Sequence, residues 1–356
     1  MTPAHSSLSR SIRAFLSPGL SFGFFGFLCL FGLFGITACG GGPDVATSTG
    51  TILYVGTGSG IYAFSLQSNN VLKPVSTSPV VSGNVYSLQY VQTPGGSGTP
   101  PVLYAATGGS SIATYTVTGG GALSSSGTLA PSSCLNNYSG VTATPDGNWL
   151  LAVDGITTPS PTYNIAAINI KTKTCYKTST SSPPATYPIS IAVDCLVGPS
   201  TCDILVTIST SVISSAVSTS PEYFQGWNTG SSSLPAPTST LTNLGKVWGS
   251  AFSPATTYFY LSVPSPGQVG SLPGGSSVTS ASTYTATATG LPGTITSPCV
   301  DQKNNQIYLP TSNGSIYQIS INTTGGIGSP NQIWNASSSS NLIPASPFMS
   351  ACTIQN

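Results

Sequence analysis

The feature that most constrains the fold is a repeat with a period of about 50 residues. Each repeat begins with small or apolar residues, turns, and continues with a second apolar run. The first residues of successive repeats are 55, 49, 58 and 47 positions apart, at Val85, Gly140, Ile189, Val247 and Thr294. Helical periodicity is absent, and each unit has room for four short strands. This pattern is typical of an all-β protein with the β-propeller fold.

The two ends of the repeating region predict how the ring closes. The segment from Thr51 to Leu66 resembles the second and third strands of a unit that lacks its first strand, and residues 347–356 resemble a first strand alone. Joined, they complete one shared blade, which leaves few sheet edges exposed. We therefore expect six four-stranded blades closed by the C-terminal strand. Seven blades are the alternative, if unit 189–246 holds an extra one; a β-sandwich array or β-solenoid is the competing fold.

Three stretches of the repeats resemble a known family. They are YVGTGSGIYAFSL from Tyr54, LYAATGGSSIATYTVTGGGAL from Leu103 and TPDGNWLLAV from Thr144. These look like the lactonase-family and YVTN-type β-propeller repeats, and the resemblance covers most of residues 51–356. It implies the fold far more strongly than a function, because the family includes lactone hydrolases and many proteins with no known activity.

The N-terminal region has the pattern of an export signal. Arg10 and Arg13, the only arginines of the chain, precede an apolar run over residues 20–38. The run ends in ITAC, which is similar to the lipobox of bacterial lipoproteins. That resemblance implies cleavage before Cys39 and lipidation of this cysteine. An uncleaved membrane anchor is the alternative, although the glycines within the run make a poor permanent helix.

The expected domain organisation follows. Residues 1–38 form the lipoprotein signal peptide, 39–50 form the lipidated cysteine and a flexible tether with a reach of roughly 18 Å, and 51–356 form the propeller. Several acyl chains on Cys39 would hold the protein stably on a membrane. By the same resemblance, Gly40 favours the outer membrane. We expect a protein of the bacterial cell envelope whose first partner is the membrane.

The small net charge and the missing residue types exclude several classes of function. Without residues 1–38, the chain keeps six lysines and seven acidic residues, for a net charge of −1, and it has no arginine and no histidine. Nothing in this balance suggests nucleic-acid binding. Ser-His-Asp and Cys-His nucleophiles cannot be built, and histidine-ligated metal sites are excluded. The sequence therefore favours a protein that is not an enzyme.

The cysteines indicate an oxidising compartment. Cys29 leaves with the signal peptide and Cys39 is the lipid site, so an even number of cysteines remains, as disulfides require. The predicted pairs are Cys195–Cys202, Cys299–Cys352 and Cys134–Cys175. The first pair flanks a turn between two strands, the second lies on first strands of neighbouring blades, and the third remains by elimination. No Cys-x₂-Cys pair is present, which argues against a metal site.

Three carboxylates are the candidates for chemistry. Asp146, Asp194 and Asp301 occupy similar places in three repeats, at or just after the end of the first strand. That region rims one mouth of a propeller channel, where carboxylates could bind a divalent cation such as calcium or serve a hydrolase. The structural interpretation is simpler, because Asp146-Gly147 is a turn pair and the other two also precede predicted turns.

Two aromatic stretches offer another lead, residues 222–227 and 257–260. Exposed aromatic side chains can stack on sugars or anchor a protein partner, but core packing between blades is the simpler interpretation. The leading functional hypothesis is a lipid-anchored binding module for a protein or glycan partner. The alternatives are a lactonase-like hydrolase that uses the channel-mouth carboxylates, and a structural surface protein without a small ligand.

Overall fold

The structure is a computed structural model that divides the chain into two compact units, Met1–Asp44 and Val45–Asn356. All described residues belong to the second unit: 50–96, 98–129, 134–154, 160–195, 200–209, 221–244, 247–263, 267–275, 278–279, 282–292, 296–335 and 351–355. The predicted signal peptide, Cys39 and the tether up to residue 49 lie outside them. The described residues form no helix that is long and apolar enough to cross a membrane.

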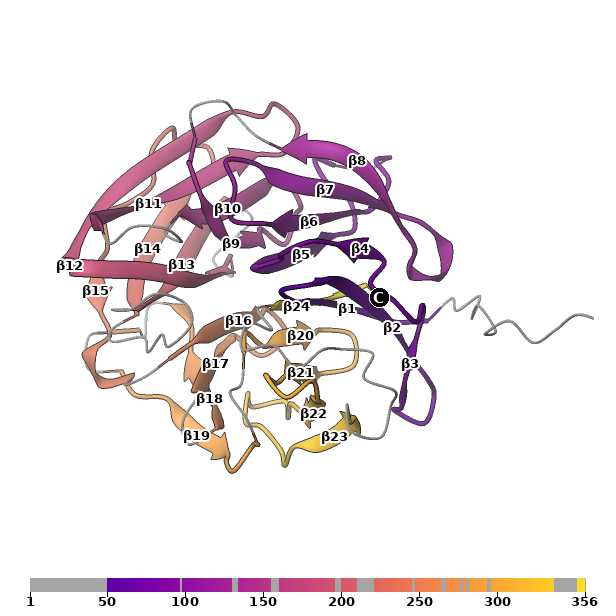
Figure 1. Ribbon diagram of the computed structural model, residues 1–356. Coiled ribbons are helices and arrows are strands. Elements are labelled where there is room, and N and C mark those ends of the chain that lie inside the picture. Colours follow the sequence, from indigo (N-terminus) through magenta and orange to yellow (C-terminus); the bar gives the residue numbers. More distant parts are fainter. Residues whose placement is uncertain are drawn as a thin grey trace, which may run out of the picture. The chain divides into compact units, whose positions relative to one another are not determined.

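The described strands form six antiparallel, four-stranded blades around a common centre (Figure 1). Blade 1 contains β24 (Ala351–Gln355), β1 (Ile52–Gly56), β2 (Gly60–Leu66) and β3 (Leu72–Pro74), with β4 (Val81–Ser82) also paired to β2. Blade 2 contains β5 (Ser87–Val91), β6 (Val102–Ala106), β7 (Ile112–Val117) and β8 (Leu123–Leu129). Blade 3 contains β9 (Tyr138–Ala143), β10 (Trp149–Asp154), β11 (Ser160–Asn169) and the first part of β12 (Cys175–Asp194).

The second half of the ring follows the same pattern. Blade 4 contains the last part of β12, β13 (Thr201–Ser209), β14 (Glu222–Asn228) and β15 (Ser239–Thr240). Blade 5 contains β16 (Gly249–Ser253), β17 (Tyr258–Val263), β18 (Gln268–Pro273) and β19 (Thr285–Ala288). Blade 6 contains β20 (Cys299–Asp301), β21 (Gln306–Pro310), β22 (Ile316–Ser320) and β23 (Asn331–Trp334). The prediction of a six-bladed propeller is confirmed.

One long strand joins two blades. The first part of β12 pairs with β11 as the outermost strand of blade 3, and its last part pairs with β13 as the innermost strand of blade 4. The change of partner falls between Thr186 and Tyr187. The two blades therefore form one continuous seven-stranded sheet, and the long fourth repeat contains one blade rather than two.

Period-two alternation places the core between the blades. On β1, Leu53 and Val55 belong to a buried cluster shared with blade 6, whereas Ile52 and Tyr54 belong to a cluster shared with blade 2. Successive side chains of a strand point to opposite faces of the sheet, and here both faces are covered by a neighbouring blade. Six buried clusters lie at the six blade-to-blade contacts. This is why the middle strands are apolar throughout instead of alternating with polar residues.

The C-terminal strand closes the ring as expected. β24 pairs with β1 from Ile52↔Gln355 to Gly56↔Ala351, so the last strand of the chain is the innermost strand of the first blade. The inner strands then follow one another around the centre in the order β24, β5, β9, β12, β16, β20 and back to β24. Closure leaves no blade at an open end of the ring.

Hydroxyl groups bridge inner strands of neighbouring blades. An innermost strand has one edge without a strand partner, and its N–H groups need acceptors. Three of them donate to a hydroxyl of the preceding blade: Tyr90 N to Thr353 Oγ1 (3.0 Å), Val141 N to Ser87 Oγ (3.0 Å) and Ser250 N to Ser190 Oγ (3.2 Å). The Ser and Thr content of the inner strands therefore helps to hold the ring together.

Three disulfides join the cysteines that the sequence analysis paired. Cys195–Cys202 closes the β12–β13 hairpin, with Cα atoms 4.0 Å apart. Cys299–Cys352 connects the neighbouring inner strands β20 and β24, with Cα atoms 5.4 Å apart. Cys134–Cys175 connects the segment before β9 to the start of β12. The second bridge therefore fixes the strand that closes the ring to the preceding blade.

Candidate functional site

A central cavity of about 500 Å³ lies between the innermost strands. Residues of all six inner strands line it. The wall continues past the ends of these strands to Gln92, Pro145 and Gln302, which are exposed. The cavity therefore opens on the face where the inner strands of blades 2, 3 and 6 end and where the first hairpins of these blades turn.

The described part of the cavity wall is neutral. Among the described residues, those that line it include hydroxyl and amide side chains but no lysine, aspartate or glutamate. Burial raises the pKa of Tyr90 to about 12, so this phenol stays protonated at neutral pH. Its hydroxyl donates to Gln92 Oε1 (2.6 Å). The wall can offer hydrogen bonds to an uncharged ligand, and its described part supplies no ready general base at neutral pH.

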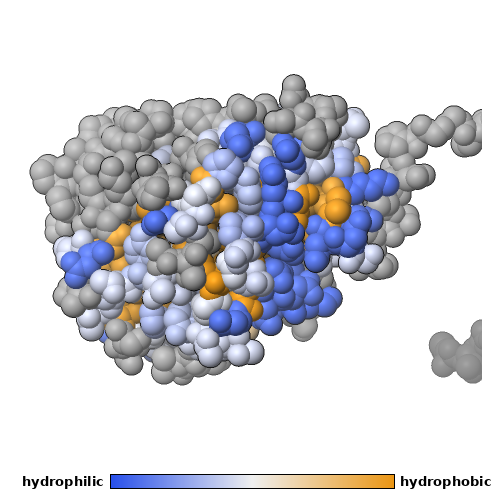
Figure 2. Space-filling model, turned by 90° about the horizontal axis from the view of Figure 1, so that it is seen from below, coloured by the Kyte–Doolittle hydropathy of each residue, from blue (hydrophilic) through white to orange (hydrophobic). Residues whose placement is uncertain are grey.

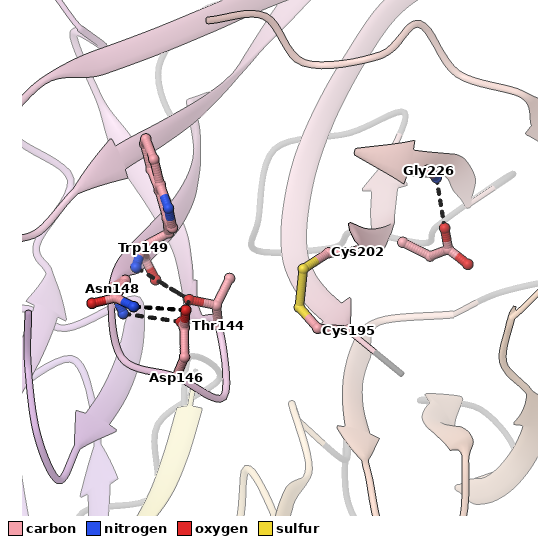
Figure 3. Close-up of a disulfide and its surroundings, with 8 residues drawn as sticks. Thr144, Asp146, Asn148, Trp149, Cys195, Cys202 and Gly226 are labelled. Atoms are coloured by element: carbon pink, nitrogen blue, oxygen red, sulfur yellow. Dashed lines mark hydrogen bonds between the residues drawn. A yellow bond between two sulfur atoms is a disulfide. The ribbon is translucent and has the colours of Figure 1, made fainter. Parts of the chain in front are cut away.

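Asp146 is engaged in its own hairpin turn. Thr144 Oγ1 donates to Asp146 Oδ1 (2.5 Å), and Asn148 donates its backbone N–H (3.1 Å) and its side-chain N–H (2.7 Å) to the same carboxylate. Figure 3 shows Asp146 directed toward Asn148, with Thr144 and Trp149 closing the turn. The neighbours Pro145 and Gly147 line the cavity, whereas Asp146 does not.

Asp301 and Asp194 are buried at the ends of inner strands in two other blades. Asp301 is fully buried and accepts hydrogen bonds from the backbone N–H (3.1 Å) and side-chain N–H (2.8 Å) of Asn304. Asp194 is 2% exposed and faces Gly274, where an added Cβ would lie 2.7 Å from Asp194 Oδ2. Neither residue lines the cavity.

The structure does not bring the three candidate carboxylates together. In the part of the chain that the structure describes, no group of three His, Cys, Asp or Glu side chains is arranged to hold a metal ion. Asp146 and Asp301 instead accept hydrogen bonds that shape turns, as the simpler interpretation expected. Their roles in catalysis or cation binding stay a prediction.

Asp203 belongs to a buried polar pair inside blade 4. It lies on β13, where Tyr223 OH donates to Asp203 Oδ2 (2.6 Å) and Gly226 N donates to Asp203 Oδ1 (2.7 Å). Figure 3 shows the Gly226 bond near the Cys195–Cys202 disulfide. Burial, together with the bond to Asp203, raises the pKa of Tyr223 above its usual range. Asp203 lies at an irregularity of the β13–β14 pairing, a position that has no local sequence signal.

The two aromatic stretches pack in the core. Tyr223 and Phe224 are fully buried and Trp227 is 1% exposed. Phe259 and Tyr260 are also fully buried, and Phe259 packs edge-on against Tyr223 with ring centroids 6.3 Å apart. The core interpretation is therefore correct for these side chains.

The described surface carries no broad apolar patch. Val71 is its one large hydrophobic side chain that is exposed. On the face drawn in Figure 2, hydrophobic residues lie as separate spots among hydrophilic and intermediate ones. Among the described residues, the central cavity is therefore a better candidate site than an apolar docking surface.

Glu222 makes a testable contribution to the pH dependence of stability. It is buried on β14 and accepts a hydrogen bond from Tyr163 OH. Burial raises the pKa of Glu222, and the bond from Tyr163 opposes this rise. The folded state therefore binds the Glu222 proton more tightly than the unfolded state does. Protonation of Glu222 stabilises the folded protein at low pH, and this stabilisation is lost as the pH rises through the folded-state pKa.

We expect Glu222→Gln to remove this loss. The amide keeps an acceptor for Tyr163 and cannot ionise, so the variant should be more stable than the wild type at neutral pH. A tenfold difference in proton affinity between the two states corresponds to about 1.4 kcal/mol. Urea unfolding between about pH 3 and pH 8 measures the effect. Tyr163→Phe, which removes the opposing bond, should steepen the loss; identical pH profiles for all three proteins would contradict the assignment.

The residues that line the cavity were not predictable from the sequence. Gln89, Gln92 and Phe252 carry no motif, and they become conspicuous only because the inner strands converge. Their position on, or directly after, the first strand of a repeat was the available signal. A periodic repeat shows which strand is innermost, but not which of its side chains reach the centre.

No protein-family model matches the chain, and no curated protein matches it in sequence. Solved structures do match. A 6-phosphogluconolactonase-like protein from Bacteroides uniformis ATCC 8492 is 13% identical, with 80% of this chain and 98% of that chain covered and a TM-score of 0.52. A second such protein, from Bacteroides fragilis NCTC 9343, is 14% identical, with 87% and 99% covered and a TM-score of 0.50.

A chain from a nidogen/laminin complex is 12% identical, with 86% of this chain and 98% of that chain covered and a TM-score of 0.52. The neighbours thus include both lactonase-like proteins and a protein from a protein–protein complex. At such low identity, a shared architecture carries no information about which of these roles applies. What the comparisons show is that this chain has the β-propeller fold, which it shares with these lactonase-like proteins and with the chain from the nidogen/laminin complex.

Proposed function

We propose that this protein is a lipid-anchored binding module of the bacterial envelope whose central cavity holds a neutral glycan. The observation that carries the proposal is the neutral cavity wall, which offers amides and hydroxyls without a described charged side chain. A charged ligand would lose its hydration there without gaining a counter-charge. A neutral sugar would exchange hydrogen bonds with water for hydrogen bonds with the wall at little cost.

The lipid anchor is the second part of the proposal. It rests on the basic, apolar and ITAC segments that end at Cys39, and on an interior with three disulfides, which suit an exported protein. We expect Cys39→Ala to move the protein from the membrane fraction to the soluble fraction, since the attached acyl chains would be lost. Fractionation followed by mass spectrometry of the N-terminal peptide measures this. An unmodified Cys39 in a wild-type membrane fraction would contradict lipidation.

A substitution that fills the cavity tests the glycan site. Ala251 lines the cavity and is partly exposed to it. Ala251→Trp should abolish binding of neutral oligosaccharides by the full-length protein in detergent, because the indole occupies the ligand's space. Ala255→Trp is the matched control, because Ala255 is exposed and does not line the cavity. Calorimetric titration measures both, and equal binding by the two variants would contradict a site in the cavity.

A lactonase-like hydrolase is the alternative function. It requires Asp146, Asp194 or Asp301 to reach a ligand, although none of them lines the cavity. A lactone panel with and without EDTA tests it. Turnover by the wild type that is lost when all three residues become asparagine would replace the binding proposal with the hydrolase.

A further inference from the structure

The cavity has two chemically different sides. In the ring order of the inner strands, β5 and β16 are three positions apart out of six, so they face each other across the centre. The partly or fully exposed residues that line the cavity on the β5 side are Ser87, Gln89, Gln92 and Thr93. Those on the β16 side are Ala251, Phe252 and Pro254. One side is therefore polar and the opposite side is apolar.

Hydrogen bonds within the polar side leave defined groups for a ligand. Gln89 Nε2 donates to the backbone oxygen of Tyr90 (2.8 Å), which leaves the Gln89 side-chain oxygen as an acceptor. Gln92 Oε1 accepts from Tyr90 OH (2.6 Å), which leaves the Gln92 amide N–H groups as donors. Both amides are thus oriented by Tyr90, and together they present a donor and an acceptor.

The apolar side is held rigidly. Phe252 packs against Phe259 of β17, with ring centroids 4.9 Å apart, and Phe259 is fully buried. An added Cβ on Gly274 would lie 3.0 Å from Phe252 Cε2, so the backbone at this glycine approaches the ring closely. Phe252 is therefore fixed by these neighbours, and the residue is partly exposed and lines the cavity.

A pyranose ring matches this division. Its C–H groups form an apolar face that packs on an aromatic ring, and its hydroxyls form a polar edge that pairs with amides. We infer that the ligand is a neutral pyranoside, bound with a C–H face toward Phe252 and a hydroxyl edge toward Gln89 and Gln92. This inference rests on the proposed function, and it adds the class of ligand and its orientation.

Saturation-transfer NMR on the full-length protein in detergent tests the inference. The probes are the methyl pyranosides of glucose, galactose, mannose, N-acetylglucosamine and glucuronic acid. We expect at least one neutral probe to receive saturation mainly on the protons of one ring face, and the glucuronide to receive none. Phe252→Ala should weaken binding about threefold to tenfold. Phe252→Leu keeps the site apolar if the alanine variant folds poorly, and it should show an intermediate loss.

Matched variants distinguish the orientation of the ligand from glycan binding itself. Gln92→Ala should also weaken binding, whereas Tyr115→Ala, on β7 and away from the cavity wall, should leave it unchanged. Neutral-probe binding that is unchanged by both the Phe252 and the Gln92 substitutions would overturn the orientation while leaving a glycan-binding protein. Equal binding of the glucuronide would overturn the claim that the ligand is neutral. If no probe binds the wild type, and neutral oligosaccharides fail as well, the proposed function itself is overturned.

Discussion

Gly249→Ala should destabilise the folded protein by about 3 kcal/mol. Gly249 opens β16, and a Cβ at this position would lie 2.4 Å from Ser297 Cα and 2.6 Å from Ser297 Oγ. The obstacle includes backbone of the neighbouring blade, so no side-chain rotation relieves it. Blades 5 and 6 would have to separate at the centre, where their inner strands meet. Urea unfolding of the variant and the wild type measures the loss.

Gly109→Ala is the matched control for this prediction. An added Cβ at Gly109 meets no atom within 4 Å, so we expect its stability to stay within about 0.5 kcal/mol of the wild type. Equal stability of the Gly249 and Gly109 variants would show that the inner strands can move apart freely, and it would refute a tightly closed centre.

Loss of the Cys299–Cys352 bridge should have the largest effect among the disulfides. We expect Cys299→Ala/Cys352→Ala to lower the free energy of unfolding by about 4 kcal/mol, the chain-entropy value for a loop of this length. The bridge has a sequence separation of 53 and joins the closing strand β24 to blade 6. Its removal therefore frees a longer segment of the unfolded chain and also weakens ring closure.

The hairpin disulfide provides the comparison. Cys195–Cys202 has a sequence separation of 7 and connects strands that already pair with each other. Its removal should cost only about 2.5 kcal/mol. Denaturant unfolding of both double variants under non-reducing conditions gives the two values. A larger loss for the hairpin variant would mean that closure depends on the β24–β1 pairing rather than on the bridge.

Much of the fold was predictable because propeller blades are local units. The period of the repeats predicts the strand count of each blade, and the incomplete first and last repeats predict that β24 pairs with β1. The shared strand β12 was less predictable. Its outer and inner parts are continuous in the sheet, whereas the sequence shows only a long fourth repeat.

The candidate site was much less predictable. Asp146, Asp194 and Asp301 align in the repeats, which made them candidates. The structure places them beside the cavity rather than in its wall. Asp146 and Asp301 accept N–H groups from nearby asparagines, as an aspartate in a turn or at a strand end readily does. The lining residue Phe252 comes from a segment without a motif.

The sequence by itself determined the all-β class, the ring with its closing strand, the cysteine pairs and the scarcity of charge. Each of these depends on local pattern, chain order or composition, which can be read along one dimension. Only the tertiary structure decided which side chains meet at the centre, that the described part of the cavity wall is neutral, and that its polar side at Gln92 faces its apolar side at Phe252. The physical reason is that the cavity is assembled from six strands far apart in the chain, so its chemistry exists only after the ring has closed.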